Sequence, residues 1–277
     1  MKAKEIKRSV REGYKKVARN GAACCGPRTK VSATSGLADS LSEKVGYSKD
    51  ELKSVPEGAN LGLGCGNPVA LGSLKPGETV LDLGSGAGLD CFLAAQIVGE
   101  SGKVIGVDMT PDMLEKAKVN AENGGYNNVE FRLGEIEELP VADGDVDVVI
   151  SNCVISLSPD KSRVFKEAFR VLKPGGRMII SDIVISKSLP DCIKDSVEAY
   201  VGCLSGAIMR DEYLKCIEGA GFQNLKVLGE TRFPLDCLVN DPTVKGIIEA
   251  STLPPEILEE VAKTIISLKI EAHRELH

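Results

Sequence analysis

The chain has 277 residues, and 43% of them are hydrophobic, which suffices for one large domain or one domain with a smaller appendage. Its 40 acidic and 34 basic residues give a net charge of −6, and no basic stripe with interleaved aromatic residues occurs. We therefore expect a small-molecule partner and no nucleic acid. No stretch approaches about 18 uninterrupted apolar residues, and charged residues stand where a signal peptide would be apolar, so we expect a cytoplasmic protein with no membrane partner.

Cysteine and histidine usage limits the chemistry available to the chain. Nine cysteines are too few for a disulfide scaffold, and in a reducing compartment they would be free thiols. Such thiols serve core packing, metal or metalloid binding, or redox chemistry. The two histidines are His273 and His277, so neither a histidine-based zinc or iron centre nor a histidine general base is expected.

The first 75 residues predict one amphipathic helix and a loop-rich segment. Apolar side chains recur at helical spacing at Ile6, Val10, Tyr14 and Val17. A tract rich in glycine, serine and cysteine follows, and it ends in the segment Gly64-Cys65-Gly66-Asn67-Pro68. We describe residues 1–75 as an N-terminal cover made of helix and loops.

Residues 76–185 show the pattern of a parallel sheet. Short apolar runs alternate with stretches of helical periodicity, which is typical of βαβ units. Thr110-Pro111 predicts the start of one helix, and Lys173-Pro174-Gly175-Gly176 predicts the end of another over residues 161–172. The expected strands are residues 79–83, 103–108, 129–133, 146–151 and 177–185.

The remaining residues, 186–277, predict a smaller portion that mixes helix and strand. Helical periodicity covers residues 191–204, 210–220 and 256–273. One or two strands are expected near residues 226–235, and they either complete the sheet or form a small C-terminal subdomain.

The segment Val80-Leu81-Asp82-Leu83-Gly84-Ser85-Gly86-Ala87-Gly88 carries the sharpest motif, a buried strand that runs into a glycine-rich turn. A dinucleotide fingerprint starting at Gly84 would need glycine at position 89, where the chain has Leu89. Asp82 precedes the glycines, and a phosphate cradle has no use for a carboxylate there. A cofactor with a free amino-acid moiety does, because the carboxylate holds its ammonium group.

Further polar residues follow the other expected strands at the edge where open α/β sheets bind ligands. Asp108 is placed to accept both hydroxyls of a ribose, and Glu135 with the next backbone amide is placed to bind an adenine edge. Asn152 follows the fourth strand. The candidate cofactor-binding residues are Asp82, Gly84, Ser85, Gly86, Gly88, Asp108, Met109, Glu135, Ile136 and Asn152.

Over residues 78–185 this set resembles the class I S-adenosylmethionine-dependent methyltransferases. The alternative is a generic Rossmann-type sheet that binds another nucleotide. The resemblance implies an α/β fold in which residues 76–185 form a Rossmann-like, S-adenosylmethionine-binding sheet. Residues 1–75 would then be its helical and loop cover, and residues 186–277 a small C-terminal α+β portion.

Three cysteines stand out as candidates for binding the methyl acceptor. Cys153 directly follows the fourth expected strand, where the transferred methyl group should point, and glycines flank Cys65 and Cys203. These positions favour accessible loops over core positions, and soft thiolates select thiophilic centres. A metalloid with its own lone pair needs no base to activate it. The other cysteines in regular patterns are expected to pack in the core: Cys91, Cys192, Cys216 and Cys237.

A narrower resemblance rests on four segments: Gly64-Cys65-Gly66-Asn67-Pro68, Gly106-Val107-Asp108-Met109-Thr110-Pro111, Ser151-Asn152-Cys153-Val154-Ile155 and Gly202-Cys203-Leu204-Ser205-Gly206-Ala207. Together they resemble the arsenite methyltransferases. The resemblance implies that Cys65, Cys153 and Cys203 bind trivalent arsenic, and that Cys24 or Cys25 is an additional redox thiol. It also implies a thiol reductant as co-substrate, thioredoxin or glutathione, with thioredoxin as a protein partner.

Two other functions fit the same residues. The first is a class I methyltransferase that acts on a quinone or another small organic acceptor. The second is a non-catalytic metalloid-binding or redox-sensing module that keeps the sheet without turnover.

Overall fold

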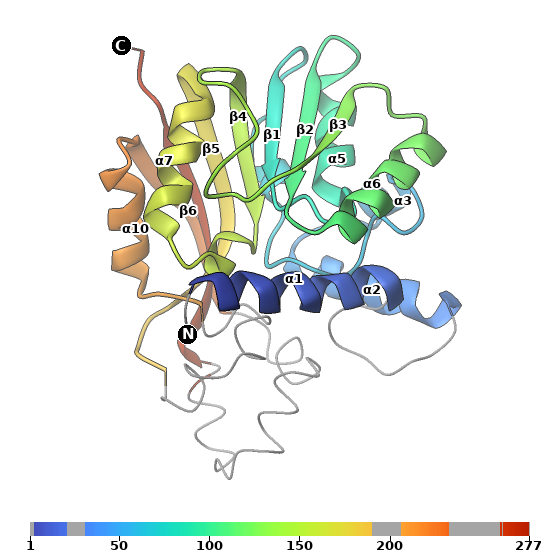
Figure 1. Cartoon of the computed structure of the whole chain (residues 1–277), viewed down its shortest axis with the longest axis horizontal. Helices are drawn as coiled ribbons and strands as arrows, with labels where there is room; N and C mark the ends of the chain where they lie inside the picture. Colours follow the sequence, from blue (N-terminus) through green and yellow to red (C-terminus); the bar gives the residue numbers. More distant parts are fainter. Residues whose placement is uncertain (1–2, 21–30, 190–205, 233–260, 262, 277) are drawn as a thin grey trace.

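The computed structural model describes residues 3–20, 31–189, 206–232, 261 and 263–276. Within them, one seven-stranded sheet has the order β3-β2-β1-β4-β5-β7-β6 (Figure 1). Strands β1 to β5 are parallel, and β7 is antiparallel to both of its neighbours. The strands are β1 Thr79–Leu83, β2 Lys103–Asp108, β3 Val129–Leu133, β4 Val146–Asn152, β5 Leu172–Ile185, β6 Gln223–Arg232 and β7 Ile265–His273.

Helices cover both faces of the sheet. Side chains of α5 (Leu89–Val98) and α6 (Pro111–Gly124) share one buried cluster with Val80, Val104 and Val148. Side chains of α7 (Lys161–Val171) and α10 (Arg210–Gly219) share another with the alternate strand residues Leu81, Ile105 and Val149. Because both faces are covered, the inner parallel strands β1, β2, β4 and β5 contain mostly apolar runs, whereas the edge strand β3 alternates apolar and charged residues.

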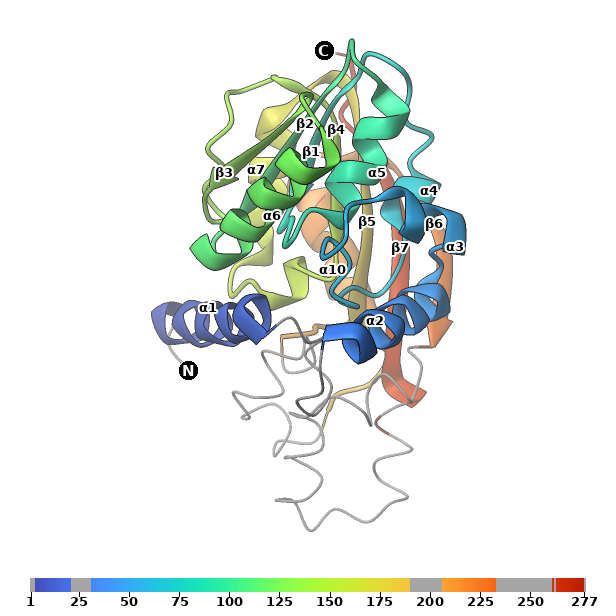
Figure 2. The same cartoon turned by 90° about the vertical axis from the view of Figure 1, so that its right-hand side faces the viewer.

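The N-terminal cover lies along the edge of the sheet where the parallel strands end. Helix α1 (Ala3–Asn20) crosses this edge in Figure 1, and Figure 2 shows α2 (Val31–Val45) along the same side of the molecule. Lys7 of α1 pairs with Glu135 after β3 (2.7 Å), and Arg19 pairs with Asp112 after β2 (2.6 Å). The predicted apolar face of α1 is confirmed, because Ile6 and Val10 are buried. The short helices α3 (Lys49–Ser54) and α4 (Pro68–Leu71) complete the cover.

The expected fold class is confirmed, and three details differ from the sequence prediction. Helix α2 stands where loop was expected, because its many small residues give only weak amphipathicity. Strand β5 begins at Leu172, so Lys173-Pro174-Gly175-Gly176 lies inside the strand. Gly175 has a φ of +81°, its N–H donates to the Arg274 carbonyl (2.8 Å), and the pairing register with β4 shifts nearby. The helix predicted over residues 161–172 does end as expected, since α7 stops at Val171, but the glycines lie in an irregular strand start and form no separate turn.

The third difference concerns the C-terminal portion. The helix predicted over residues 256–273 is wrong for Ile265–His273, which form β7 between β5 and β6. Alternate side chains of this segment are buried at Leu268, Ile270 and Ala272, a period-two pattern that two neighbouring strands fix. β6 confirms the strand expected near residue 226, and α10 confirms the helix expected over 210–220. Both C-terminal strands complete the sheet; the helix expected over 191–204 lies outside the described residues.

None of the helices in the described part of the chain is long and apolar enough to cross a membrane.

The burial pattern of β7 predicts a contrast between two isoleucines of the same strand. Ile270 is fully buried between β5 and β6, whereas Ile266 is only partly buried. Ile270→Ala should lower the free energy of unfolding by about 2–5 kcal/mol, and Ile266→Ala should lower it by less than half as much. Urea denaturation of both variants measures the difference, and equal losses would contradict the placement of β7.

Candidate active site at the carboxyl edge of the sheet

The turn after β1 presents bare backbone to a ligand. Gly84, Gly86 and Gly88 have φ values of +70°, +53° and +99°, a region that favours glycine. A Cβ at Gly88 would come within 2.7 Å of the Phe92 ring, but a Cβ at Gly86 would meet nothing within 4 Å. The turn lies at β1, where the strand order reverses toward β4, and open α/β sheets bind ligands at such a point.

Asp108, at the end of β2, is fixed by the same turn. Its Oδ2 accepts a hydrogen bond from the Gly86 N–H (3.0 Å), and its Oδ1 accepts one from the Thr110 N–H (2.8 Å). Burial raises the pKa of Asp108, although these two bonds oppose the shift. A carboxylate offers about four acceptor positions, so the Asp108 carboxylate keeps lone pairs for a diol such as a ribose.

Two buried carboxylates next to the turn have no basic partner among the described residues. Asp82 accepts a hydrogen bond from the Cys91 thiol (3.3 Å), and Asp90 accepts one from the Tyr47 hydroxyl (2.6 Å). Burial, followed by the charge of Asp90, raises the pKa of Asp82 well above its usual range, and burial raises the pKa of Asp90 to about 6. The pair therefore suits a cationic ligand group. Asp90 was not predicted from the sequence, because an acidic residue in the first turn of a helix is ordinary.

Ser85 adds a further polar group beside this turn. Its hydroxyl is buried and has no hydrogen-bond partner among the described residues. Buried polar groups are nearly always satisfied, so this hydroxyl is available to hydrogen-bond a bound ligand. The turn, the free lone pairs of Asp108 and the unpaired carboxylates therefore fit the amino-acid and ribose parts of S-adenosylmethionine.

Glu135, Ile136 and Met109 lie at the same edge but contact protein groups. Glu135 pairs with Lys7 (2.7 Å) and with Arg11 (3.3 Å) of α1. Ile136 is buried in the core cluster on the α7 side of the sheet, and Met109 is half-buried against the cluster that contains Cys65 and Cys153. Helix α1 therefore covers the position where an adenine was expected.

Asn152, at the end of β4, holds the loop that carries Cys65. Its Oδ1 accepts from the Cys65 N–H (3.0 Å), and its Nδ2 donates to the Gly66 carbonyl (2.8 Å) and to the Tyr47 hydroxyl (2.8 Å). A Cβ at Gly64 would come within 2.8 Å of Asn152 Nδ2, and one at Gly66 would overlap the Ser181 hydroxyl. The glycines around Cys65 therefore allow close packing of the loop on β4 and β5.

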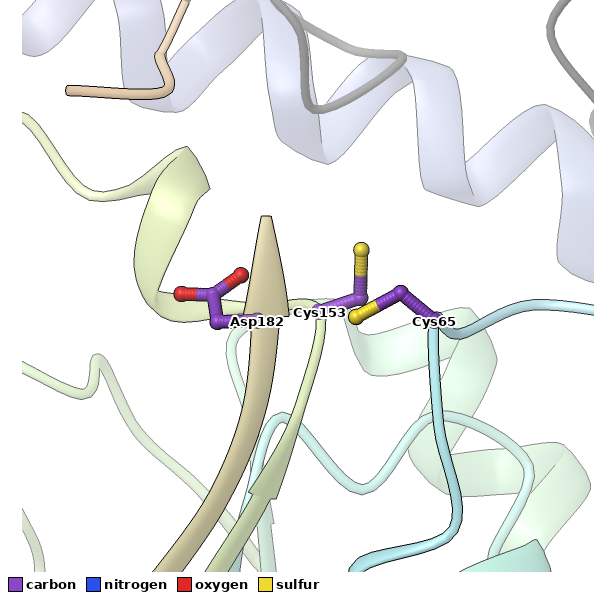
Figure 3. A group of neighbouring side chains, drawn as sticks. All are labelled: Cys65, Cys153 and Asp182. Atoms are coloured by element: carbon purple, nitrogen blue, oxygen red, sulfur yellow. The ribbon is translucent and has the colours of Figure 1, made fainter. Parts of the chain in front are cut away.

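Cys65 and Cys153 meet at this edge. Their sulfur atoms and one carboxylate oxygen of Asp182 all lie within 4.8 Å of one another, and in Figure 3 Cys153 stands between the other two side chains. Cys153 has a φ of +59°, unusual for a residue with a Cβ, and its N–H donates to the Ser181 carbonyl (2.8 Å). The thiols lie off regular strands and helices as expected, but the expectation of accessibility is wrong. Only 2% of Cys65 and 9% of Cys153 is exposed.

Asp182 is a member of this cluster that sequence reasoning missed. Its Oδ2 accepts from the Ser156 N–H (2.9 Å) and the Tyr213 hydroxyl (2.8 Å), and its Oδ1 accepts from the Ile183 N–H (2.8 Å). Burial raises the pKa of Asp182 against these bonds and against the nearby charge of Lys161. The available signal was a single charged residue, Asp182, in the largely apolar second half of β5, where an unpaired charge would be costly.

The other predicted cysteines divide into two groups. Cys91 is fully buried and Cys216 is half-buried next to the core cluster of α7, as the packing prediction requires. The remaining ones lie outside the described residues: Cys24, Cys25, Cys192, Cys203 and Cys237. The assignments of Cys203 to arsenic and of Cys24 or Cys25 to redox chemistry therefore stay predictions.

Comparisons with known proteins identify related sequences and folds. Residues 74–221 match the family described as a methyltransferase domain. An arsenite methyltransferase of Halobacterium salinarum is 51% identical over 229 residues, which are 80% of this chain and 59% of that protein. One from Aquipseudomonas alcaligenes is 44% identical over 60% of this chain and 49% of that protein. The chain thus spans about half to three-fifths of the length of these two relatives.

A solved structure extends the comparison. The crystal structure of an arsenic(III) S-adenosylmethionine methyltransferase from Chlamydomonas reinhardtii is similar, with a TM-score of 0.61 and 32% sequence identity. The match covers 85% of this chain and 73% of that one. The methyltransferase-domain family matches more than half of the chain, and this arsenic(III) methyltransferase is 32% identical with 73% of its length covered. The chain therefore belongs to the arsenite methyltransferase family of class I S-adenosylmethionine-dependent methyltransferases.

Proposed function

We propose that this chain transfers methyl groups from S-adenosylmethionine to trivalent arsenic held by cysteine thiolates, giving methylated arsenicals and so detoxifying arsenic. The observation that carries the proposal is the convergence of Cys65 and Cys153 beside the glycine-rich turn. Their sulfur atoms lie within 4.8 Å of each other, and Val154, the next residue after Cys153, packs so closely against Gly84 that no Cβ fits there. The thiols and the candidate cofactor turn are thus neighbours.

S-adenosylmethionine supplies an electrophilic methyl group on a sulfonium. In our proposal Asp82 and Asp90 hold its ammonium group, the backbone at Gly86 lies against it, and Asp108 holds the ribose hydroxyls. Glu135 and the Ile136 amide would bind the adenine once α1 moves and its ion pairs with Glu135 break. Residues 76–185 thereby hold the cofactor, while residues 1–75 and 186–277 contribute Cys65 and Cys203 to the acceptor site.

Arsenite binds by exchange of ligands at arsenic. Each cysteine thiol replaces one hydroxyl, so three As–S bonds form and three water molecules leave with the thiol protons. Cys65, Cys153 and Cys203 are the proposed ligands. The product is a neutral, pyramidal arsenic with a lone pair, which needs no general base. Burial of Cys65 and Cys153 orients the acceptor, and such alignment is worth up to about 7–11 kcal/mol of barrier.

Methylation also changes the oxidation state of arsenic. Its lone pair forms the new As–C bond while the S–CH3 bond of the sulfonium breaks and the thioether leaves with that electron pair, so arsenic passes from the trivalent to the pentavalent state. Two electrons must then return for the next transfer, and thiols supply them by forming a disulfide. We propose Cys24 or Cys25 together with thioredoxin or glutathione for this step. The reaction thus requires a reducing compartment, which is why we propose the cytoplasm.

The carboxylate pair predicts how cofactor affinity depends on pH. Asp90 has a pKa of about 6 without a ligand, raised by burial, so below pH 6 it must lose a proton to hold an ammonium group. Affinity for S-adenosylhomocysteine should therefore fall at least tenfold per pH unit below pH 6, because Asp90 alone contributes one linked proton. Calorimetry between pH 5 and 8 measures this.

The same shift has the opposite sign for the stability of the unliganded protein. Because the folded pKa of Asp90 is raised, its contribution to stability is present below the unfolded value near 4 and is lost as pH rises through 6.

Asp90→Asn should flatten the pH dependence of cofactor affinity. An unchanged slope in that variant would remove Asp90 from the ammonium site.

Arsenic speciation tests the proposed function directly. The protein should convert arsenite to methylated species when incubated with labelled S-adenosylmethionine and a thiol reductant. Cys153→Ser should abolish this while S-adenosylhomocysteine affinity stays within a few-fold, because a serine hydroxyl stays protonated and binds soft metalloids poorly. Cys216→Ser, a half-buried thiol on α10, is the matched control and should keep activity. Label transfer to a quinone instead, or arsenic binding without turnover, would contradict the proposal in favour of one of the two alternatives.

Ligand stoichiometry predicts a substrate-dependent effect at Cys65. Arsenite has three exchangeable hydroxyls, whereas monomethylarsonous acid has two, so one thiol becomes dispensable. Cys65 belongs to the N-terminal cover and Cys153 to the end of β4, so we expect Cys65 to close the site for arsenite. Cys65→Ser should fail on arsenite and still methylate the monomethyl species, as measured by product formation at saturating cofactor. Full activity on both substrates would exclude Cys65 as a ligand.

A further inference from the structure

The cluster of Cys65, Cys153 and Asp182 contains a hard ligand that arsenic chemistry does not require. Two thiols and one carboxylate come from three different segments: the loop before α4, the residue after β4, and strand β5. All three side chains are at least nine-tenths buried. We propose that these residues bind a thiophilic divalent cation of the zinc type through two sulfur atoms and one oxygen. This goes beyond the proposed function, since it shares two thiols with the arsenic site but needs neither arsenic nor a third cysteine.

The distances fit such a cation after a small movement. Zinc binds thiolates at about 2.3 Å and carboxylates at about 2.0–2.2 Å, so the ligand atoms of a tetrahedral site are roughly 3.5–3.8 Å apart. Here the three ligand atoms lie within 4.8 Å of one another. The Cys65 sulfur points toward Cys153 in Figure 3, so rotation of the short cysteine side chains closes the difference. Three protein ligands leave the fourth position of the cation open.

Asp182 is oriented as carboxylate ligands of metals usually are. The Ser156 N–H and the Tyr213 hydroxyl hold its Oδ2, and the Ile183 N–H holds its Oδ1. Hydrogen bonds of this kind fix the orientation of ligating groups, and their loss typically weakens metal binding. Three of about four acceptor positions are occupied, so one remains on Oδ1 for a cation.

Charge also favours a dication. Two thiolates and one carboxylate carry a charge of −3, and a divalent cation leaves −1. Lys161 supplies the balancing positive charge: it is 9% exposed, donates to the carbonyls of Ser156 and Ser158 (3.2 and 2.9 Å), and acts electrostatically on Asp182. The two sulfur ligands exclude magnesium and calcium, which prefer oxygen, and select soft or borderline cations. A cation in this cluster would occupy two of the proposed arsenic ligands and block methylation.

Cadmium is a suitable probe, because its bonds to thiolates absorb in the ultraviolet. The reduced protein, free of arsenic and cofactor, is titrated with cadmium chloride. Cys65→Ser and Cys153→Ser should each lose the tightest site, and Cys216→Ser should keep it. Asp182→Asn should keep the thiolate absorption at saturation but bind at least tenfold more weakly. Tyr213→Phe, which keeps all three ligands and removes one orienting bond, should weaken binding by about tenfold.

A further measurement keeps the result interpretable. Cadmium-113 magnetic resonance of the unmodified protein reports the ligand atoms directly, so the answer does not depend on whether Asp182→Asn folds. A resonance typical of two sulfur ligands with oxygen supports the proposal, and one typical of three or four sulfur ligands overturns it. Unchanged cadmium affinity in a folded Asp182→Asn variant also overturns it.

Cys203→Ser separates this inference from the arsenic proposal. That variant should lose arsenite methylation, because it lacks the third proposed thiolate, yet retain the cadmium site at full affinity. Loss of the cadmium site in Cys203→Ser would mean that a third thiol replaces Asp182 and would overturn the inference while leaving the arsenic proposal intact. Added zinc should inhibit arsenite methylation competitively with arsenite, and uncompetitive or absent inhibition would contradict a shared site.

Discussion

The hydrogen bond from the Cys65 N–H to Asn152 Oδ1 is the contact on which the geometry of the acceptor site depends. It attaches a loop of the N-terminal cover to the end of β4, one residue before Cys153. The Asn152 amide also donates to the Gly66 carbonyl and to the Tyr47 hydroxyl, so one partly buried side chain fixes the backbone on both sides of the thiol. Withdrawal of the loop would break the bonds that Asn152 makes to the Cys65 N–H and the Gly66 carbonyl, each worth about 0.5–1.5 kcal/mol. The spacing of the backbone at Cys65 and Cys153 is therefore set by these contacts, and the cysteine side chains rotate from fixed positions.

The same network reaches the cofactor turn. The Tyr47 hydroxyl donates to Asp90, and Asp90 lies close enough to Asp82 that its charge raises the pKa of Asp82. Groups on the acceptor side and on the cofactor side are thus joined through a single tyrosine and a single asparagine. A change in the charge of the carboxylate pair alters the acceptor strength of Asp90, and Asp90 shares Asn152 Nδ2 with the Cys65 loop (3.2 Å). The two halves of the site are consequently coupled by hydrogen bonds through buried groups, where such bonds are strong.

Features of the fold that follow from local sequence periodicity were predicted well. Features that depend on contacts with distant segments of the chain were not. Strands β1 to β4 were placed within a residue, because apolar runs between helices have few other solutions. Strand β7 was predicted as helix, since only its pairing with β5 and β6 selects period two over helical spacing. Cys153 was placed by its position after a strand, which sequence shows. Asp182 was missed, because a single aspartate in a strand acquires meaning only from the thiols and the tyrosine that the fold brings to it.

Asn152 and the glycines around Cys65 are further residues whose role depends on contacts that the sequence does not show. Glycines around Cys65 were interpreted as signs of an accessible loop, but they permit the backbone to pack against Asn152 and Ser181. Sequence reveals that a position needs no side chain, and it does not reveal whether solvent or protein occupies the space. Asn152 was assigned to the cofactor for a similar reason. Its place at a strand end was right, whereas its observed partners come from residues 62 to 105 positions away in sequence.

Helix α1 contacts both the cofactor side and the acceptor side of the site. Its ion pairs and its apolar contacts contribute different amounts to the free energy that holds it there. Its ion pairs with Glu135 and Asp112 are partly exposed, and exposed pairs are worth about 0–1 kcal/mol each. Burial of Ile6 and Val10 against the cluster that contains Cys65 and Cys153 is worth about 1.5–3 kcal/mol per side chain. The apolar contacts therefore hold the helix, and the ion pairs set its direction across the strand ends. The apolar cluster that holds α1 also contains Cys65 and Cys153. Helix α1 therefore covers the cofactor edge but is held mainly by contacts at the acceptor site.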